Sequence, residues 1–227
     1  MCNRSRSVGA PRCAPTEIEC GHGMHRAKDG LMRLLVASAN EGKVREIREL
    51  LRGLEGVEVV GLGDYADVPE LPEPFETFEE NAVSKAMTAA EFCGCWALAD
   101  DSGLEVEALG GRPGVFSSRY GRDDAERIAK LLGELRGLKP EQRRARFVCV
   151  AVLCRPGEVL GRWVGTCGGE IAEAPRGTAG FGFDPVFLYE GRTFAEMTPQ
   201  EKNAVSHRGR ALREFARALP GILDEAL

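Results

Sequence analysis

Two adjacent acids, Asp100 and Asp101, follow the apolar run CWALA and are followed at once by Ser102 and Gly103. We expect a buried strand to end at these acids, because a short apolar run bounded by Ser and Gly is typical of a core strand. A carboxylate at the mouth of a cleft can hold Mg²⁺ or accept a proton from water. Neighbouring side chains of a strand point to opposite faces, so one acid is expected to do the chemistry and the other to support it. The alternative interpretation is a pair of aspartates that only form a turn.

A second candidate is the turn SANEGK, residues 38–43, which lies between an apolar stretch and an amphipathic one. A Gly-containing turn between a strand and a helix exposes backbone N–H groups at the positive end of the helix dipole, and Lys43 adds a full charge beside them. These features predict a phosphate site. The stretch is not a P-loop, because that motif needs Gly in place of Ala37 and Ser or Thr in place of Val44. The alternative is an ordinary helix start with a solvated lysine.

The candidate residues must be positioned by strands and helices, which the spacing of apolar residues predicts. Apolar runs predict strands over 33–38, 57–62, 95–100, 145–154 and 159–167, the last two forming a hairpin. Helical spacing and cap signatures predict helices over 43–51, 77–92 and 123–135, with a further helical stretch beginning at Thr198. Strands interleaved with helices, plus one hairpin, predict an α/β fold with a mixed sheet. In open α/β sheets, ligands bind at the carboxyl ends of strands, where both candidate stretches are expected.

Composition narrows the class of protein. The chain has 227 residues, enough for one substantial core, and a formal net charge of -5, which offers no overall basic field for nucleic acid or an anionic membrane. No apolar run approaches the about 20 residues that cross a bilayer. We therefore expect a soluble protein whose anionic ligand is met by local cations or by a metal.

The cysteines and the N-terminal segment add two expectations. Among eight cysteines, the pair Cys93-Gly94-Cys95 has the wrong spacing for a zinc knuckle, so we expect reduced thiols in the cytoplasm. Residues 1–31 are rich in Gly, Pro, Arg and Ser and lack both the helical and the strand period, which predicts a disordered extension. Met24 or Met32 is then a candidate biological start, and residues 32–227 form the expected folded domain.

Six motifs stand in an order that closely resembles the ITP/XTP pyrophosphatase family. They are SANEGK, ENAVSKA, ADDSGLEVEALGGRPGVFSSRY, ARF, GFGFDPVF and EMTPQEKNAVSHRGRAL. The resemblance runs from about Arg33 to Leu219, and the joint order of the motifs is what makes it specific. It departs from the common family pattern at Ser38, where threonine is frequent, and at Phe183, where tyrosine is frequent.

The resemblance implies Mg²⁺-dependent hydrolysis of a non-canonical purine nucleoside triphosphate (ITP, dITP or XTP) to a monophosphate and pyrophosphate. It also implies an elongated mixed sheet flanked by helices, with the nucleotide in a cleft between two lobes, and a homodimer. Neither a nucleic-acid polymer nor a membrane is an expected partner.

By motif position the resemblance also assigns site residues. Asp101 is assigned to the reacting water, Glu73 and Asp101 to the metal, and Ser102 to a substrate contact. The residues assigned to the triphosphate are Ser38, Ala39, Asn40, Glu41, Gly42 and Lys43. Those assigned to the nucleotide are Phe181, Gly182, Phe183, Asp184, Lys202, His207 and Arg208.

Base selection follows from hydrogen-bond chemistry. Hypoxanthine and xanthine carry a 6-keto acceptor where adenine carries an amino donor, so a fixed donor such as Arg208 or a backbone N–H favours the former. Phe181 or Phe183 is expected to stack on the purine. The alternatives are a turn followed by core aromatics for GFGF, and a polar residue near a helix start for His207.

Several alternatives stay open at this point. Lys85, with Glu80, is either a cation for the phosphates or part of a solvated helix face. Asp-Ser-Gly at 101–103 also occurs in aspartic proteases, where two such carboxylates share a proton, so this single copy would have to dimerise through that loop. A sensor that binds nucleotides without turnover is a third possibility.

Overall fold

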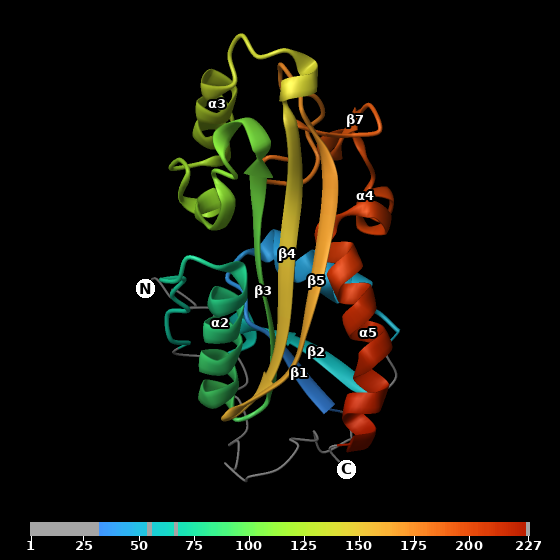
Figure 1. The fold of residues 1–227 in the computed structure, drawn as a ribbon. Helices are drawn as coiled ribbons and strands as arrows, with labels where there is room; N and C mark the ends of the chain where they lie inside the picture. The colour runs from blue at the N-terminus through green and yellow to red at the C-terminus, as the bar shows by residue number, and fades with distance from the viewer. Residues whose placement is uncertain (1–31, 54–55, 66–67, 226–227) are drawn as a thin grey trace, which may run out of the picture.

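The computed structural model describes residues 32–53, 56–65 and 68–225, so the N-terminal extension predicted over 1–31 lies outside the described residues. Within this part, seven strands form one sheet in the order β2-β1-β3-β4-β5-β6-β7 (Figure 1). The strands are β1 (Met32–Val36), β2 (Val57–Gly61), β3 (Trp96–Val106), β4 (Arg144–Arg155), β5 (Glu158–Ile171), β6 (Phe187–Tyr189) and β7 (Arg192–Thr193). The helices are α1 (Glu41–Leu50), α2 (Phe78–Cys93), α3 (Asp124–Glu134), α4 (Pro199–Val205) and α5 (His207–Glu225).

The sheet is mixed, as the sequence predicts. β1 pairs in parallel with β2 and β3, whereas every pair from β3 onward is antiparallel. The long hairpin of β4 and β5 lies at the centre of the molecule and extends along most of its length (Figure 1). The predicted α/β class is therefore confirmed.

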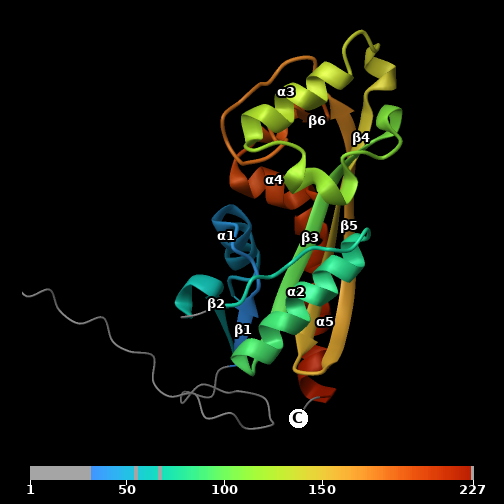
Figure 2. The same cartoon turned by 90° about the vertical axis from the view of Figure 1, so that its left-hand side faces the viewer.

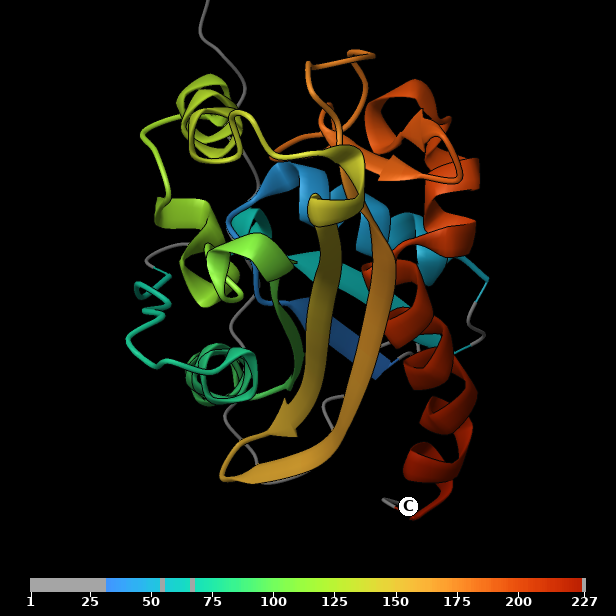
Figure 3. The same cartoon turned by 45° about the horizontal axis from the view of Figure 1, so that its top comes forward.

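Helices cover both faces of the sheet at the end that holds β1. The small residues of α2 pack on one face, where Ala82, Ala86 and Ala90 meet Ala97 and Ala99 of β3. The opposite face is covered by α5 and α1, whose apolar side chains pack with Trp96 and Leu98 of β3 and with Cys149, Ala151 and Leu153 of β4. Figure 3 shows α2 and α5 on opposite sides of the hairpin. The alternation of β3 thus decides which helix each of its side chains meets.

A second core fills the other end of the molecule. Side chains from α3, from the far halves of β3 to β5 and from β6 gather around Phe147, Phe187 and Phe194. Figure 2 places α3, β6 and α4 together at this end, with α1, β1 and β2 at the other. In the part of the chain described here, no helix is long and apolar enough to cross a membrane.

One prediction about β3 is wrong. The strand does not end at the acids; it continues to Val106, so Asp100 and Asp101 lie in its middle and do not form a turn. The reason is non-local, because β3 pairs with β4 along ten residues, from Ala97 to Val106. The neighbour on its other side is much shorter, since β1 ends at Val36, opposite Leu98. The acids therefore stand just beyond the carboxyl end of β1, which is where a ligand site of a parallel sheet is expected.

Candidate active site

The turn after β1 is built as a helix start. Asn40 caps α1, its side-chain Oδ1 accepting the backbone N–H of Lys43 at 3.1 Å, and its own N–H donates to the hydroxyl of Ser38 at 3.2 Å. This geometry presents the first turn of α1 and its partial positive charge toward β3. The side chain of Lys43 then reaches across to β3, where its Nζ lies 3.1 Å from Oδ2 of Asp100.

Asp100 lies on the α5 face of the sheet, in contact with cations. Its Oδ2 accepts the hydroxyl of Ser102 at 2.6 Å, and Nε of Arg208 lies 3.3 Å away. Its side chain is only 1% exposed. Burial alone would raise the pKa of Asp100, but Lys43, Arg208 and Lys85 outweigh it and hold that pKa well below the ordinary value of 3.8. Asp100 is therefore a fixed negative charge that anchors two cations, the supporting role expected for one of the two acids.

Asp101 lies on the opposite face, toward α2. Its Oδ1 pairs with Nζ of Lys85 at 3.1 Å, and its Oδ2 accepts the amide of Asn81 at 3.3 Å. The same Lys85 ammonium lies 2.6 Å from Oε1 of Glu73 and donates to the backbone carbonyl of Asp100 at 2.8 Å. Burial, together with the negative charge of Glu73, raises the pKa of Asp101 above 3.8, although Lys85 and Lys43 act to lower it.

Asn81 fixes the segment that carries Glu73. Its side-chain amide donates to the carbonyl of Phe75 at 3.1 Å and accepts the N–H of Phe75 at 2.9 Å. Arg119 also donates to the backbone carbonyl of Glu73 at 2.8 Å. These bonds tie the loop before α2 to the helix, so the side chain of Glu73 is held beside that of Asp101. The sequence motif ENAVSKA contains Asn81, but its pairing with a loop six residues upstream left no signal in the spacing.

Glu73 and Asp101 fit a Mg²⁺ ion. Both carboxylates already contact a single cation, the Lys85 ammonium, and their mutual repulsion is part of why the pKa of Asp101 is raised. Among residues 32–53, 56–65 and 68–225, no group of three or more His, Cys, Asp or Glu side chains is placed to hold a metal. A hard ion bound by only two protein carboxylates suits Mg²⁺, which usually takes its remaining ligands from water and substrate phosphates.

The two ambiguous residues of α2 have different surroundings. Lys85 is buried between Glu73 and Asp101, so it belongs to the site. Glu80 is exposed and hydrogen-bonds the hydroxyl of Thr77 at the start of α2, so it belongs to the solvated end of the helix.

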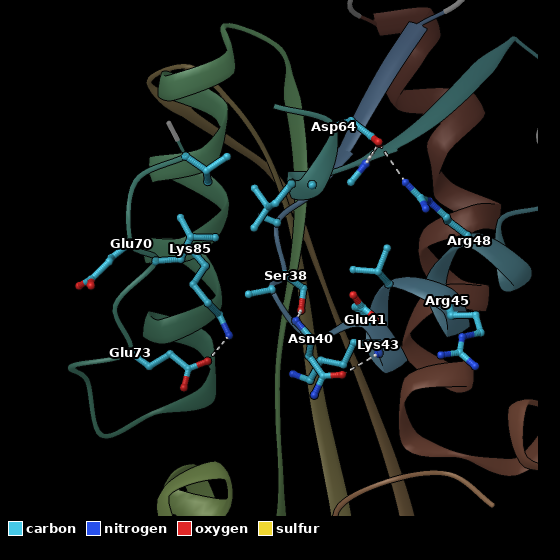
Figure 4. A pocket seen from close by; sticks show the side chains of 18 of the residues that line it. Ser38, Asn40, Glu41, Lys43, Arg45, Arg48, Asp64, Glu70, Glu73 and Lys85 are labelled. Carbon is cyan, nitrogen blue, oxygen red and sulfur yellow. Dashed lines mark hydrogen bonds and ion pairs between the residues drawn. The ribbon is translucent and has the colours of Figure 1, made fainter. Parts of the chain in front are cut away.

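Two adjoining pockets contain these groups. The open one, of about 1400 Å³, is lined by the turn of residues 38–41, Lys43, Glu73 and Lys85. Figure 4 shows Lys43 on one wall and Glu73 with Lys85 on the facing wall. The second pocket, of about 110 Å³, shares Asn40, Lys43 and Glu73 with the first. It is lined further by predicted site residues: Asp101, Ser102, Phe181, Gly182, Phe183, Asp184, Lys202, His207 and Arg208.

A buried network of charges holds the deeper pocket together. Lys202 bridges Asp184 and Glu46, its Nζ lying 2.7 Å from a carboxylate oxygen of each. Arg208 also pairs with Glu46 through Nη1, whereas its Nε faces Asp100. Glu46 thereby fixes two cations of the pocket, and they lower its pKa against the effect of burial. The amphipathic pattern of α1 does not single out Glu46, because an acid in a charged amphipathic helix resembles a solvated one.

The aromatic candidates differ in position. Phe181 is half-buried, and Nζ of Lys202 lies 4.8 Å from its ring centroid. Phe183 is buried and packs edge-on against Tyr120, with ring centroids 6.4 Å apart. Phe181 therefore has the freer face for a purine, while Phe183 also serves the core.

His207 is the first residue of α5 and is buried, with its ring stacked on Phe147 at a centroid distance of 4.6 Å. Burial lowers its pKa well below 6.5, so the ring is neutral. Within the described part of the chain its Nδ1 has no hydrogen-bond partner, which leaves a polar atom available in a pocket.

Of the residues assigned to the triphosphate, Gly42 alone lines neither pocket. A Cβ at this position would lie 2.9 Å from Cδ1 of Phe181, so glycine is needed to let the phosphate turn approach the Phe181 ring. The turn and the GFGF segment are 138 residues apart in sequence, counted from Lys43 to Phe181, and the fold makes them neighbours.

Comparison with known proteins identifies the family of the chain. Residues 34–218 match the Ham1 family. A protein of Thermosynechococcus vestitus named dITP/XTP pyrophosphatase is 54% identical over 138 residues, which are 60% of this chain and 70% of that protein. One of Geobacter sulfurreducens with the same name is 49% identical over 187 residues, or 80% of this chain and 94% of that protein.

Solved structures show the same fold. The Ham1 protein of Coxiella burnetii superimposes with a TM-score of 0.76 at 44% identity, covering 84% of this chain and 100% of that one. A structure titled nucleoside-triphosphatase / dITP/XTP pyrophosphatase, from Mycobacterium abscessus, gives 0.65 at 45% identity, covering 81% and 97%. The resemblance seen in the motifs is confirmed. The chain belongs to the Ham1 family.

Proposed function

We propose that this protein hydrolyses non-canonical purine nucleoside triphosphates, namely dITP, XTP and ITP, to the monophosphate and pyrophosphate. Its relatives named dITP/XTP pyrophosphatase support the activity. The observation that carries it in this chain is the convergence of Glu73 and Asp101 on one cation, across a pocket from the lysine-bearing turn. A pair of carboxylates facing a lysine-bearing helix start supports the proposal, because a metal and a phosphate chain would then meet in one pocket.

The triphosphate needs its charge offset before a nucleophile can approach. Lys43 and the N-terminal N–H groups of α1 bind phosphate oxygens on one wall, and Lys85 faces them from the other. Glu73 and Asp101 would hold Mg²⁺, which would supply further charge neutralisation at the phosphates.

Asp101 is the residue we assign to the attacking water. Its carboxylate is buried and lines the pocket that also contains Lys43, so it can accept a proton from a water in that pocket. It takes a proton from water as the water oxygen bonds to the α-phosphorus, and pyrophosphate leaves. Asn81 and Lys85 fix the carboxylate from two directions, which orients it for this proton transfer.

The deeper pocket is the proposed purine site. Arg208 is held by Asp100 and Glu46, so its remaining N–H groups form a fixed donor set that favours a 6-keto acceptor. An adenine would present its amino donor to that set and leave buried groups unpaired, which gives large discrimination. The Phe181 ring provides the stacking surface.

The two rival functions fit the geometry less well. In an aspartic protease, two carboxylates share a proton, whereas Asp101 shares the ammonium of Lys85 with Glu73. A sensor without turnover would need no group placed to activate water. We further propose that residues 32–227 act as one two-lobed unit, in a homodimer in the cytoplasm, on the strength of the motif resemblance.

One panel tests the proposal. The purified protein is incubated with Mg²⁺ and separately with dITP, XTP, ITP, ATP and GTP, and the products are resolved by chromatography. We expect monophosphate and pyrophosphate from the first three, and loss of both when EDTA removes the metal. Release of single phosphates through the diphosphate would show that a different bond is cut. Intact nucleotide despite tight binding would support the sensor.

A further inference from the structure

The end of α2 and the start of β3 bring two thiols into contact. Cys93 is the last residue of α2, and Cys95 stands directly before β3. Their Sγ atoms are 2.7 Å apart, compared with about 2.05 Å in a disulfide bond. Neither thiol has a part in the proposed hydrolysis.

Gly94 makes this contact possible. Its backbone is left-handed, with φ 63° and ψ 17°, a conformation that glycine adopts without strain. The turn reverses the chain, so both thiols enter the same apolar cluster between α2 and the sheet. The contact is therefore a consequence of how the helix ends, and it persists as long as that turn is folded.

The two thiols are not equivalent. The hydrogen bond between the two thiols lowers the pKa of Cys93, and the same bond together with burial raises the pKa of Cys95. Cys93 is thus the better nucleophile of the pair, since thiolate is the reactive form. Cys93 itself is 7% exposed and Cys95 4%, whereas Phe92, the neighbour of Cys93, is 39% exposed, so the pair lies just beneath the surface at the last turn of α2.

A closed metal site is the less suitable interpretation. In the described part of the chain, these cysteines do not belong to any group of three or more side chains able to hold a metal. Two thiols in contact with no further ligand are suited to oxidation instead.

We propose that Cys93 and Cys95 form a redox-active dithiol that closes to an intramolecular disulfide in reaction with a small-molecule disulfide such as oxidised glutathione. The Cys93 thiolate attacks one sulfur of the oxidant and expels the first glutathione thiolate, leaving a mixed disulfide at Cys93. Cys95 then loses its proton, attacks Sγ of Cys93 and expels the second. Two electrons pass from the protein to the oxidant, which is released as two reduced glutathione molecules.

The disulfide closes a very short loop, so little stabilisation by chain entropy is expected. The thiol pair is also far from the proposed active site. Lys85 lies eight residues before Cys93 on α2, which is about 12 Å at the rise of an α-helix. Turnover is therefore expected to be the same in both redox forms.

The chain offers a clean readout. Trypsin cleaves after Lys85 and Arg119, and does not cleave after Arg112 because proline follows, so one peptide carries Cys93 and Cys95 and no other cysteine. The full-length protein is equilibrated in glutathione buffers of rising disulfide content, quenched with acid, alkylated under denaturing conditions and digested. We expect this peptide to become two hydrogen atoms lighter and to lose both alkylation sites together.

Three variants and one control complete the test. Cys93→Ser and Cys95→Ser should abolish the internal disulfide, whereas Cys154→Ser, in the same apolar cluster, should leave it unchanged. Urea-unfolded protein in the same buffers shows that the chemistry works. The proposal would be overturned if the peptide from native protein kept two free thiols while the peptide from unfolded protein was oxidised. A mixed disulfide with glutathione that is not converted to the Cys93–Cys95 disulfide would also overturn it.

Discussion

The two faces of β3 shift the pKa values of two neighbouring aspartates in opposite directions. On the face covered by α5 and α1, Asp100 meets Lys43 and Arg208, and its pKa falls. On the face covered by α2, Asp101 shares one ammonium with Glu73, and burial together with the negative charge of Glu73 raises its pKa. Two identical side chains, one residue apart, thus acquire different roles because of the helices that pack on them. The lesson is that the ratio of cations to carboxylates on each face, rather than burial alone, assigns the chemistry.

The largest effect is expected for Asp101→Asn. The amide keeps the shape but cannot accept the proton of water and binds Mg²⁺ weakly, so turnover of dITP should fall about 10²–10⁴-fold. The fold should survive, because Lys85 retains Glu73 and the carbonyl of Asp100. Pyrophosphate release measures the rate, and circular dichroism checks the fold. Glu105→Gln, on the same face of β3, is the matched control and should keep normal turnover. Near-normal rates in Asp101→Asn would remove its assignment.

Asp100→Asn should act mainly on stability. Removing this charge leaves Lys43 and Arg208 without their shared partner, and breaking a buried ion pair costs about 3–5 kcal/mol. Urea denaturation of the two asparagine variants side by side measures the difference. If Asp101→Asn proved the less stable of the two, the contrast between the faces would be wrong.

Glu73→Gln should weaken the metal site selectively. Loss of one of two carboxylates is expected to raise the Mg²⁺ concentration for half-maximal rate at least about tenfold, judging from the effect of lesser changes around metal sites. Glu70→Gln is the control, because Glu70 lines the same open pocket and is exposed. Equal Mg²⁺ requirements in both variants would show that Glu73 does not bind the ion.

The pH dependence of stability should separate the faces further. Because folding lowers the pKa of Asp100, its ionised form stabilises the protein above 3.8, and that contribution is lost as the pH falls below this value. Folding raises the pKa of Asp101, so ionisation of Asp101 costs stability as the pH rises through that raised value. The free energy of unfolding, followed from neutral to acid pH, should fall less steeply in Asp100→Asn than in the wild type. An unchanged acid slope in that variant would contradict the lowered pKa.

Local patterns predicted much of this arrangement. The cap at Thr77 is a short-range hydrogen bond between residues close in sequence, and α2 begins where expected. Helix α1 begins at Glu41, two residues before the predicted start at Lys43, because Asn40 caps it. The opposite orientation of Asp100 and Asp101 follows from strand alternation alone. The position of the two acids inside a long strand could not be predicted in this way, because it depends on the pairing of β3 with β4.

Long-range pairing explains the other misses. Glu46 and Lys202 are 156 residues apart and meet only in the folded protein. Lys85 was ambiguous for the same reason, since its partners lie 12 and 16 residues away on other elements. The spacing of a helix shows which residues share a face, but not whether that face meets solvent or carboxylates.

The central claim is that Glu73 and Asp101 hold the catalytic ion together. The most direct measurement is anomalous diffraction from crystals grown with Mn²⁺, which takes the same oxygen ligands as Mg²⁺, and a non-hydrolysable dITP analogue. We expect an anomalous peak in contact with carboxylate oxygens of both Glu73 and Asp101. A manganese ion bound elsewhere, or bound by the analogue's phosphates without either carboxylate, would contradict the account.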